Sequence, residues 1–474
     1  MLFHAEDFVE VDRLFDEYFS LGKTPGLIYG ITIGPEIIYV RTLGVSVMKG
    51  SAPNSKTSFR VASLTKSFTG AAVLLLRDRG QISLEMPIAN YLPELRDLQG
   101  QLSDSRKITV RMLLGMSAGF PSDDGWADRL EAIGEEEFGE ILKAGIRFDS
   151  LPGTRYEYSN LGYALLARII YQITGRRFIQ FVTEEFLIPL ELNNSTFDYE
   201  SASDLAIGYV RRDEWQSEIL TGPGAFSAIG GLITNLEDLA KWSGYLSEAF
   251  NPDSPERGPL WKATRREMQE IQQIIPEKRK LDSKLSHTGV KGYGIGLAVE
   301  EDYDFGKIVG HSGGYPGYGS HMRWHTATQI GVIALANGRY ASPVAACVPA
   351  LRYLLSKTQQ PVVRPSKECL TLQIQVNGLI ENWNDQLAEE IFGHNMDLDH
   401  PRSYRRKKIA DGIGKIGGLI SSTTNLEMRS ENASHLTWKL AGDRGNLHIE
   451  IWLTPDLPAK LQAWEVSPID LLNS

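Results

Sequence analysis

Cysteine and long apolar runs are scarce in this sequence. Only Cys347 and Cys369 occur among the 474 residues, so the chain is not a cysteine-stapled secreted scaffold. The sequence contains no Cys-x-x-Cys pair of the kind that binds structural zinc. The longest apolar run, residues 71–76, is far too short to cross a bilayer. We therefore expect buried free thiols and no membrane span.

Positively charged residues are fewer than negatively charged ones. Lys and Arg number 49 against 59 Asp and Glu, a net charge of −10, whereas binding along nucleic-acid phosphates needs an excess of positive charge on some face. We therefore expect no nucleic-acid partner. We interpret the densest basic cluster as a solvated helix face, with docking against another domain or subunit as the alternative. The cluster consists of Arg402, Arg405, Arg406, Lys407 and Lys408.

The first residues lack the features of an export signal. Glu6 and Asp7 stand where a signal peptide would carry Lys or Arg followed by an apolar core. The sequence as given therefore predicts a cytoplasmic location. A trimmed, exported protein would look the same, so this alternative stays open.

Residue patterns predict an antiparallel sheet that is built from both ends of one domain. Apolar spacing predicts a helix over residues 7–21, and β-rich runs at 26–33 and 36–43 predict a hairpin. Short strands are expected over residues 293–299, 307–310, 318–324 and 330–336, and a helix is expected over 344–355. Between them, about residues 63–290, the pattern is helical, with helices at 63–79 and 161–173 and a third opened by a Thr234–Glu237 capping box. We expect an α/β (α+β) domain over residues 1–360, with helices flanking the sheet and an inserted all-helical subdomain.

A second domain is expected after a linker bracketed by Pro361 and Pro365. Apolar residues at helical spacing predict one helix over residues 379–391. Two alternating runs, 436–440 and 447–451, flank a Gly-Asp-Arg-Gly turn and predict a hairpin. Residues 366–474 therefore form a small α+β domain whose role the composition does not indicate.

The most informative motif is Ser63-x-x-Lys66. On a helix these two side chains share a face, and a neighbouring amine helps to deprotonate a serine hydroxyl that is otherwise a poor nucleophile. The alternative is that Ser63 only caps a helix. Ser46-x-x-Lys49 has the same spacing, but it lies between a strand and a loop, where no helix forces the side chains together.

Two further motifs follow in the order that one enzyme family shows. Tyr158-Ser159-Asn160 begins a predicted helix, and His311-Ser312-Gly313-Gly314 ends a predicted strand. Together with Ser63-x-x-Lys66, they make residues 7–357 resemble the penicillin-recognising serine hydrolases: class C β-lactamases, D-aminopeptidases, D,D-peptidases and related esterases. The resemblance implies a β-lactamase-like fold, and it does not cover the C-terminal domain.

The resemblance also implies a role for each motif residue. Ser63 would be the acylated nucleophile, Lys66 its activator, and Tyr158 would transfer a proton. Asn160 would hydrogen-bond the substrate backbone, and the strand that carries His311 and Gly313 would line the substrate site. The backbone amides of Ser63 and Gly314 would form the oxyanion hole.

His311 departs from the family pattern, in which Lys is common. A histidine with an ordinary pKa near 6.5 is neutral at pH 7 and anchors a carboxylate poorly, whereas acidification would charge it. We therefore expect that a free C-terminal carboxylate is not the main recognition group. His287-x-Gly289 has the same form but precedes a strand, so we assign it to a loop. His321 and His325 share a strand face, but no third ligand is evident, so we expect no metal site.

These observations predict a serine hydrolase that cleaves an amide or ester of a small or peptide-like substrate through an acyl-enzyme, without metal or organic cofactor. Within that class we favour a peptidase or amidase with a preference for D-residues. The alternatives are a carboxylesterase or a β-lactamase, and, from another class, a catalytically silent scaffold or sensor. The sequence leaves a homo-oligomer open.

Overall fold

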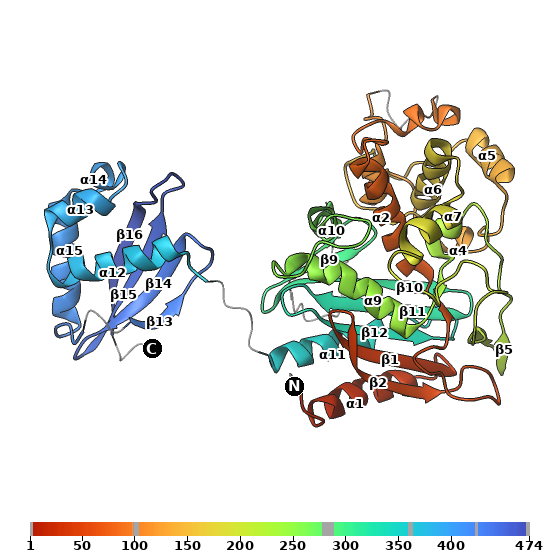
Figure 1. The fold of residues 1–474 in the computed structure, drawn as a ribbon, viewed down its shortest axis with the longest axis horizontal. Helices are drawn as coiled ribbons and strands as arrows, with labels where there is room; N and C mark the ends of the chain where they lie inside the picture. Colours follow the sequence, from red (N-terminus) through yellow and green to blue (C-terminus); the bar gives the residue numbers. More distant parts are fainter. Residues whose placement is uncertain are drawn as a thin grey trace. The chain divides into compact units, whose positions relative to one another are not determined.

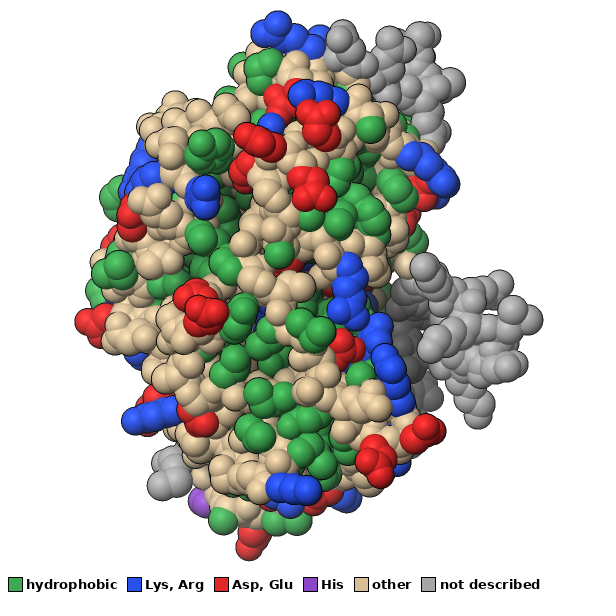
Figure 2. Space-filling view, turned by 90° about the vertical axis from the view of Figure 1, so that its right-hand side faces the viewer, with side chains coloured by type: hydrophobic (Ala, Val, Ile, Leu, Met, Phe, Trp, Pro, Cys, Tyr) green, Lys and Arg blue, Asp and Glu red, His purple; other side chains and the backbone are tan. Residues whose placement is uncertain are grey.

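The chain forms two compact units in a computed structural model, Met1–Gln360 and Pro361–Ser474. The structure describes residues 3–96, 98, 104–276, 289–358, 364–421 and 425–470. No helix of these ranges is long and apolar enough to span a membrane. On the face drawn in Figure 2, acidic and basic side chains are interspersed, so this face presents no broad field of one sign.

An antiparallel sheet forms the centre of the larger unit. Its strand order is β2-β1-β12-β11-β10-β9-β8-β7, so the N-terminal hairpin pairs with the last strand before residue 340. This order confirms that the sheet is assembled from both ends of the domain (Figure 1). The strands are β1 (Gly26–Ile33), β2 (Glu36–Gly44), β7 (Gln273–Ile274), β8 (Gly289–Tyr293), β9 (Ala298–Asp302), β10 (Gly306–Tyr315), β11 (Tyr318–His325) and β12 (Ile330–Ala336).

Both faces of the sheet are covered by helices, which explains the nearly continuous apolar run of β1. Leu27, Tyr29 and Ile31 belong to one core with α1 (Asp7–Ser20) and α11 (Val344–Ser356). Ile28 joins the opposite core, and Gly30 contacts Leu236 of α9 (Leu236–Ser247) on that side. Successive side chains of a strand point to opposite faces of the sheet. Because helices cover both faces here, both sets of side chains are buried and nearly all are apolar.

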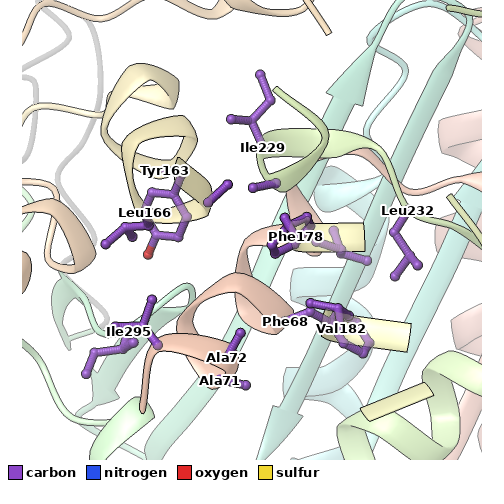
Figure 3. Close-up of a cluster of buried hydrophobic side chains, with 14 of the residues drawn as sticks. Phe68, Ala71, Ala72, Tyr163, Leu166, Phe178, Val182, Ile229, Leu232 and Ile295 are labelled. Atoms are coloured by element: carbon purple, nitrogen blue, oxygen red, sulfur yellow. The ribbon is translucent and has the colours of Figure 1, made fainter. Parts of the chain in front are cut away.

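The inserted segment is mainly helical, and α2 (Thr65–Asp78) lies at its centre. Residues 65–76 of this helix are all buried. Figure 3 shows Phe68 and Ala72 of α2 among side chains from α6, α7 and α8, such as Tyr163, Val182 and Ile229. The remaining helices and helical turns here are η1 (Ala62–Leu64), η2 (Ile88–Asn90), η3 (Pro93–Leu95), α3 (Val110–Leu114), α4 (Asp124–Ala127), α5 (Glu135–Ala144), α6 (Asn160–Thr174), α7 (Phe178–Val182), η4 (Thr183–Leu187), α8 (Ser227–Gly230), η5 (Glu248–Phe250) and α10 (Lys262–Met268).

Several expectations are wrong in detail. The insert is not purely helical. It contains the pair β4 (Tyr209–Arg211) and β5 (Trp215–Ser217), the strand β6 (Ile233–Thr234), which pairs with β3 (Phe59–Arg60) just before the insert, and β7, which joins the central sheet. The single strand expected over 293–299 is the end of β8, a tight turn through Gly296 at φ +70°, and the start of β9. A glycine allows this turn because it adopts positive φ without strain.

The helix expected to open with a Thr234–Glu237 capping box is capped differently. Asn235 is the N-cap of α9, and its side chain accepts a hydrogen bond from the Asp238 amide at 2.9 Å. The Thr234 hydroxyl instead pairs with Ser195, and the Glu237 carboxylate accepts from Ser55. Tertiary partners therefore outcompete the local capping box.

The smaller unit packs helices on an antiparallel sheet of order β13-β14-β15-β16. The predicted hairpin is confirmed, with Leu436, Trp438 and Leu440 paired to Ile451, Ile449 and Leu447. The helix expected over 379–391 is two helices, because Asn384 caps a new one. The elements are α12 (Lys367–Glu381), α13 (Asp385–Ile391), α14 (Met396–Asp399), α15 (Arg402–Lys415), β13 (Asn425–Arg429), β14 (His435–Ala441), β15 (Gly445–Leu453) and β16 (Leu461–Asp470).

The basic cluster on α15 is only partly a solvated face. Arg405 is buried and donates to the Met396 carbonyl at 2.8 Å. Arg402 pairs with Asp397 and Glu389, and Lys408 pairs with Glu465. Because carboxylates inside the same unit neutralise much of this charge, the cluster is not a free anion-binding surface.

The two units have separate cores, so removal of the smaller one should leave the larger one folded. We expect a chain that ends at residue 360 to be soluble and to unfold in one cooperative thermal transition, followed by far-UV circular dichroism. The segment from residue 361 onward, expressed alone, is the reciprocal test. Aggregation of the truncated chain, or melting without a cooperative transition, would contradict independent folding.

Candidate active site

Ser63 lies in a sharp turn between β3 and α2. The turn is the short helix η1, and the preceding Ala62 has φ +50°, a left-handed conformation that is rare outside glycine. The Ser63 side chain caps neither η1 nor α2, whose N-cap residues are Val61 and Leu64. Its hydroxyl is half-buried and is left available for chemistry. The capping interpretation of Ser63 is therefore wrong.

Lys66 is fully buried beneath Ser63. Its Nζ atom donates to the Ser63 Oγ atom at 3.0 Å and to the Ile229 carbonyl oxygen at 2.8 Å. Burial lowers the pKa of Lys66 to about 8, opposed by the negative charges of Asp124, Asp128 and Asp123, in that order. About a tenth of Lys66 is then neutral at pH 7, a useful fraction for a group that must accept a proton.

Tyr158 stands directly before α6 and faces the same two side chains. The Lys66 Nζ atom lies 5.1 Å from the centroid of its ring, and its hydroxyl interacts with Ser63. Burial raises the pKa of Tyr158 well above 10, an effect that the hydrogen bond with Ser63 opposes. At neutral pH this group is a phenol, which can donate a proton and then recover it.

His311 is a buried, neutral imidazole. Its Nδ1 atom is 2.6 Å from the Ser312 carbonyl oxygen, which only accepts, so Nδ1 carries the proton and Nε2 accepts from the Tyr293 hydroxyl at 3.1 Å. Burial, and then the charge of Lys66, lower the pKa of His311 to about 4. The expectation that His311 becomes charged on acidification through pH 6.5 is therefore wrong.

The two glycines after His311 serve different purposes. A Cβ atom on Gly313 would lie 2.2 Å from Ser320 Oγ and 2.3 Å from the Val61 carbonyl oxygen, so only glycine lets β10 approach the Ser63 turn this closely. Gly314 lies beside Ser63 in the cleft wall. Its position fits a second backbone donor for an oxyanion, whereas Gly313 acts through packing.

Asn160 lies outside the wall of the cleft. It is buried at the start of α6, where its Nδ2 atom donates to Asp124 Oδ1 at 2.8 Å and to Asp123 Oδ1 at 3.2 Å. Its backbone amide also donates to Asp123 at 2.7 Å. In this structure the Asn160 side chain binds two carboxylates, and its role toward a substrate stays a prediction.

The motif residues meet at a cavity of about 340 Å³. A larger cavity of about 690 Å³ near Ile88 and Ile108 contains none of them, so we place the site at the smaller one, where the reactive groups converge. The smaller cavity is lined by Ser63, Asp124, Tyr156, Tyr158, Ile275, Tyr293, Ala298, His311, Ser312, Gly314 and Tyr340. Sequence reasoning missed Tyr156, Tyr293 and Tyr340, which belong to no spaced motif, although the spacing of Tyr156 and Tyr158 was a usable signal.

A buried ion pair connects the two sides of the cavity. Glu131 pairs with Arg60, three residues before Ser63, and both side chains are almost fully buried. The other carboxylate oxygen of Glu131 accepts from the hydroxyl of Tyr315, the residue after Gly314, at 2.8 Å. One carboxylate thus holds the Ser63 turn and the end of β10 in fixed relation.

The other candidate residues do not form sites. Ser46 donates to the Ser51 carbonyl, with no contact to Lys49. His321 pairs with Ser312, and His325 with Thr328 and the Phe305 carbonyl; the described residues contain no group of three or more metal-ligating side chains. Cys347 and Cys369 are free and buried. His287 lies outside the described residues.

Known proteins resemble this chain in sequence over about two thirds of its length. Protein flp of Staphylococcus aureus (strain MW2) is 26% identical over 344 residues, covering 69% of this chain and 62% of its own length. Penicillin-binding protein 4* of Bacillus subtilis (strain 168) is 25% identical over 315 residues, covering 64% of this chain and 66% of its own. This chain thus spans less than two thirds of both relatives.

Solved structures share the fold. An octameric penicillin-binding protein homologue from Pyrococcus abyssi has a TM-score of 0.63 and 22% identity, covering 94% of this chain and 91% of its own. A D-stereospecific amidohydrolase from Streptomyces sp. has a TM-score of 0.55 and 22% identity, covering 71% of this chain and 97% of its own. A class C beta-lactamase has a TM-score of 0.60 and 18% identity, covering 75% of this chain and 99% of its own. The Beta-lactamase family model matches residues 11–354. The chain therefore belongs to the beta-lactamase family, whose fold and motif order its sequence resembles.

Proposed function

We propose that this protein is a serine hydrolase that works through an acyl-enzyme. The observation that carries the proposal is the 3.0 Å contact between Lys66 Nζ and Ser63 Oγ at the base of an open cavity. Neutral Lys66 accepts the Ser63 proton as Oγ attacks a carbonyl carbon, and the amides of Ser63 and Gly314 stabilise the oxyanion. Tyr158 gives its proton to the leaving group and recovers one from Lys66. Water then hydrolyses the ester by the reverse path.

Within this class we favour a peptidase or amidase with a preference for D-residues. A neutral His311 offers no positive charge to a substrate carboxylate, and the described residues that line the cavity include no Lys or Arg. The preference for D-residues is supported only by the family resemblance and by the shared fold of the D-stereospecific amidohydrolase. A carboxylesterase would use the same groups, so esters belong in every test. A silent scaffold is disfavoured because nucleophile, base and phenol are all in contact.

The nucleophile can be tested by covalent labelling. A fluorophosphonate should label the wild-type protein at one serine, Ser63, identified by peptide mass spectrometry. Ser63→Ala should abolish labelling, whereas Ser46→Ala, at the matched Ser-x-x-Lys spacing, should leave it unchanged. Labelling that survives in Ser63→Ala would remove Ser63 from the mechanism.

The pH dependence of acylation should report Lys66. Since the neutral amine is the active form and its pKa is about 8, the labelling rate should fall about tenfold per pH unit below that value and level off above it. Lys66→Ala should lower the rate by about 10² to 10⁴ and remove this pH dependence. Tyr158→Phe should lower substrate turnover by a similar factor, with unchanged circular dichroism. A wild-type rate that is flat between pH 6 and 8 would contradict the role of Lys66.

The identity of residue 311 should control the preference for carboxylates. Because His311 stays neutral down to about pH 4, substitution and not acidification is the informative change. In His311→Lys, the ratio of kcat/KM for a chromogenic cephalosporin over a neutral aryl ester should rise, since an ammonium can anchor the cephalosporin carboxylate. His311→Gln is the neutral control and should leave the ratio unchanged. An unchanged ratio in an active Lys variant would show that residue 311 does not face that carboxylate.

A further inference from the structure

We propose that Asp124 forms a subsite for the ammonium group of a substrate with a free amine, so that the scissile bond joins an α-amino acyl group to its leaving group. The inference rests on the proposed function and specifies its substrate. Asp124 is the one acidic side chain among the described residues that line the cavity with Ser63, and these residues include no Lys or Arg. The other walls are aromatic, small or neutral, and a lone carboxylate in such a cleft selects positive charge.

Asp124 is held in place by a hydrogen bond, and Lys66 interacts with it electrostatically without a direct ion pair. It is the first residue of α4 and is exposed to solvent. The buried amide of Asn160 donates to its Oδ1 atom at 2.8 Å, and Asn160 is itself fixed by Asp123. No Lys or Arg in the described part of the chain forms an ion pair with Asp124. The carboxylate is therefore preorganised and has capacity for a further donor.

Aromatic rings complete the subsite. The ring of Tyr293 lies 5.9 Å from that of Tyr156 and 6.2 Å from that of Tyr158, which makes one aromatic wall, and Tyr340 lines the same cavity. Ring faces attract ammonium groups, and the attraction adds to that of a carboxylate. The same wall gives no benefit to a substrate carboxylate, which would also be repelled by Asp124.

The position of Asp124 matches the chemistry at Ser63. The α-ammonium of an aminoacyl substrate is two bonds from the carbonyl carbon that Ser63 would attack, so both groups must enter the same small cavity. A carboxylate beside the nucleophile can therefore reach the amine of the acyl part. N-acylation of that amine removes the charge and two of its donors, and so removes the basis of recognition.

Ammonium binding would also act on the base. Asp124 is the strongest of the carboxylates that oppose the lowered pKa of Lys66. The other groups around Lys66 are Ser63, Tyr158, Tyr163, His311, the Ile229 carbonyl, Asp123 and Asp128. When a substrate cation neutralises Asp124, more of Lys66 becomes neutral and able to accept the Ser63 proton. Loss of the carboxylate by mutation should mimic this shift.

The experiment uses the full chain and compares kcat/KM for D-alanine p-nitroanilide with kcat/KM for its N-acetyl derivative. Wild type should prefer the free amine, and Asp124→Asn should lower that preference by about tenfold or more, mainly through KM. Asp124→Glu should restore part of it. Asp128→Asn is the matched control: it removes a second negative charge near Lys66 that does not line the cavity, so the preference should persist. In both Asn variants the pH profile of fluorophosphonate labelling should move to lower pH, which a purely structural effect would not produce.

Protection of Ser63 covers the case in which neither anilide is turned over. D-Alaninamide should slow fluorophosphonate labelling more than N-acetyl-D-alaninamide does, and Asp124→Asn should abolish the difference. The subsite would be overturned if Ser63 is labelled but the free-amine compounds are neither better protectants nor better substrates than their N-acetyl derivatives in wild type. It would also be overturned if their advantage is unchanged in Asp124→Asn. Either result would leave the proposed serine hydrolase intact. No labelling of Ser63 and no turnover would overturn both.

Discussion

The burial of one ammonium group governs this site. Lys66 lies on a helix whose first three turns are enclosed on every side, so its charge has no water to stabilise it. Desolvation favours the neutral amine, while the Ile229 carbonyl and the nearby aspartates keep the charged form accessible. A fully solvated lysine would remain protonated at neutral pH, and an apolar pocket without carboxylates would leave it permanently neutral. The observed balance permits both states, which proton transfer requires.

A second buried charge maintains the geometry around the first. Ser63 and Gly314 are far apart in the sequence and meet because the Ser63 turn packs against β10 and β11, where the Ser320 hydroxyl donates to the Val61 carbonyl oxygen at 2.7 Å. Glu131 binds Arg60 on one side and Tyr315 on the other, next to these two residues. Removing one partner of such a pair leaves an uncompensated buried charge, at a cost of about 3–5 kcal/mol. The pair therefore acts as a geometric constraint, and it offers little net stability compared with an apolar pair.

The architecture could be predicted from sequence where local pattern and tertiary structure agree. The hairpin at β1 and β2, the strand order built from both ends, and the β14–β15 register all follow from periodicity and turn residues. Errors arose where distant partners decide the outcome. Thr234 bonds to Ser195 instead of capping α9, and Glu237 bonds to Ser55. Neither partner is visible in a local window.

The same limit applies to the candidate site. Ser63, Lys66 and Tyr158 could be predicted because each belongs to a motif with short, regular spacing. Tyr293 and Asp124 belong to no such motif, and only the folded chain places them in the wall of the cavity. Charge states were harder still. The ordinary pKa of histidine predicts a switch near pH 6.5, but burial beside Lys66 keeps His311 neutral to about pH 4.

In the proposed hydrolase, catalysis and substrate choice are linked through this electrostatic arrangement. Burial and then the positive charge of Lys66 disfavour protonation of His311. With His311 neutral, Asp124 is the remaining charged residue type on the described wall of the cavity. A cleft of this kind favours cationic acyl groups and disfavours anionic ones. A Lys at position 311 would reverse that preference, but it would also place a second ammonium near Lys66 and so lower the pKa of the base. Selection between carboxylate-bearing and amine-bearing substrates therefore cannot be separated from the pH at which the serine is activated.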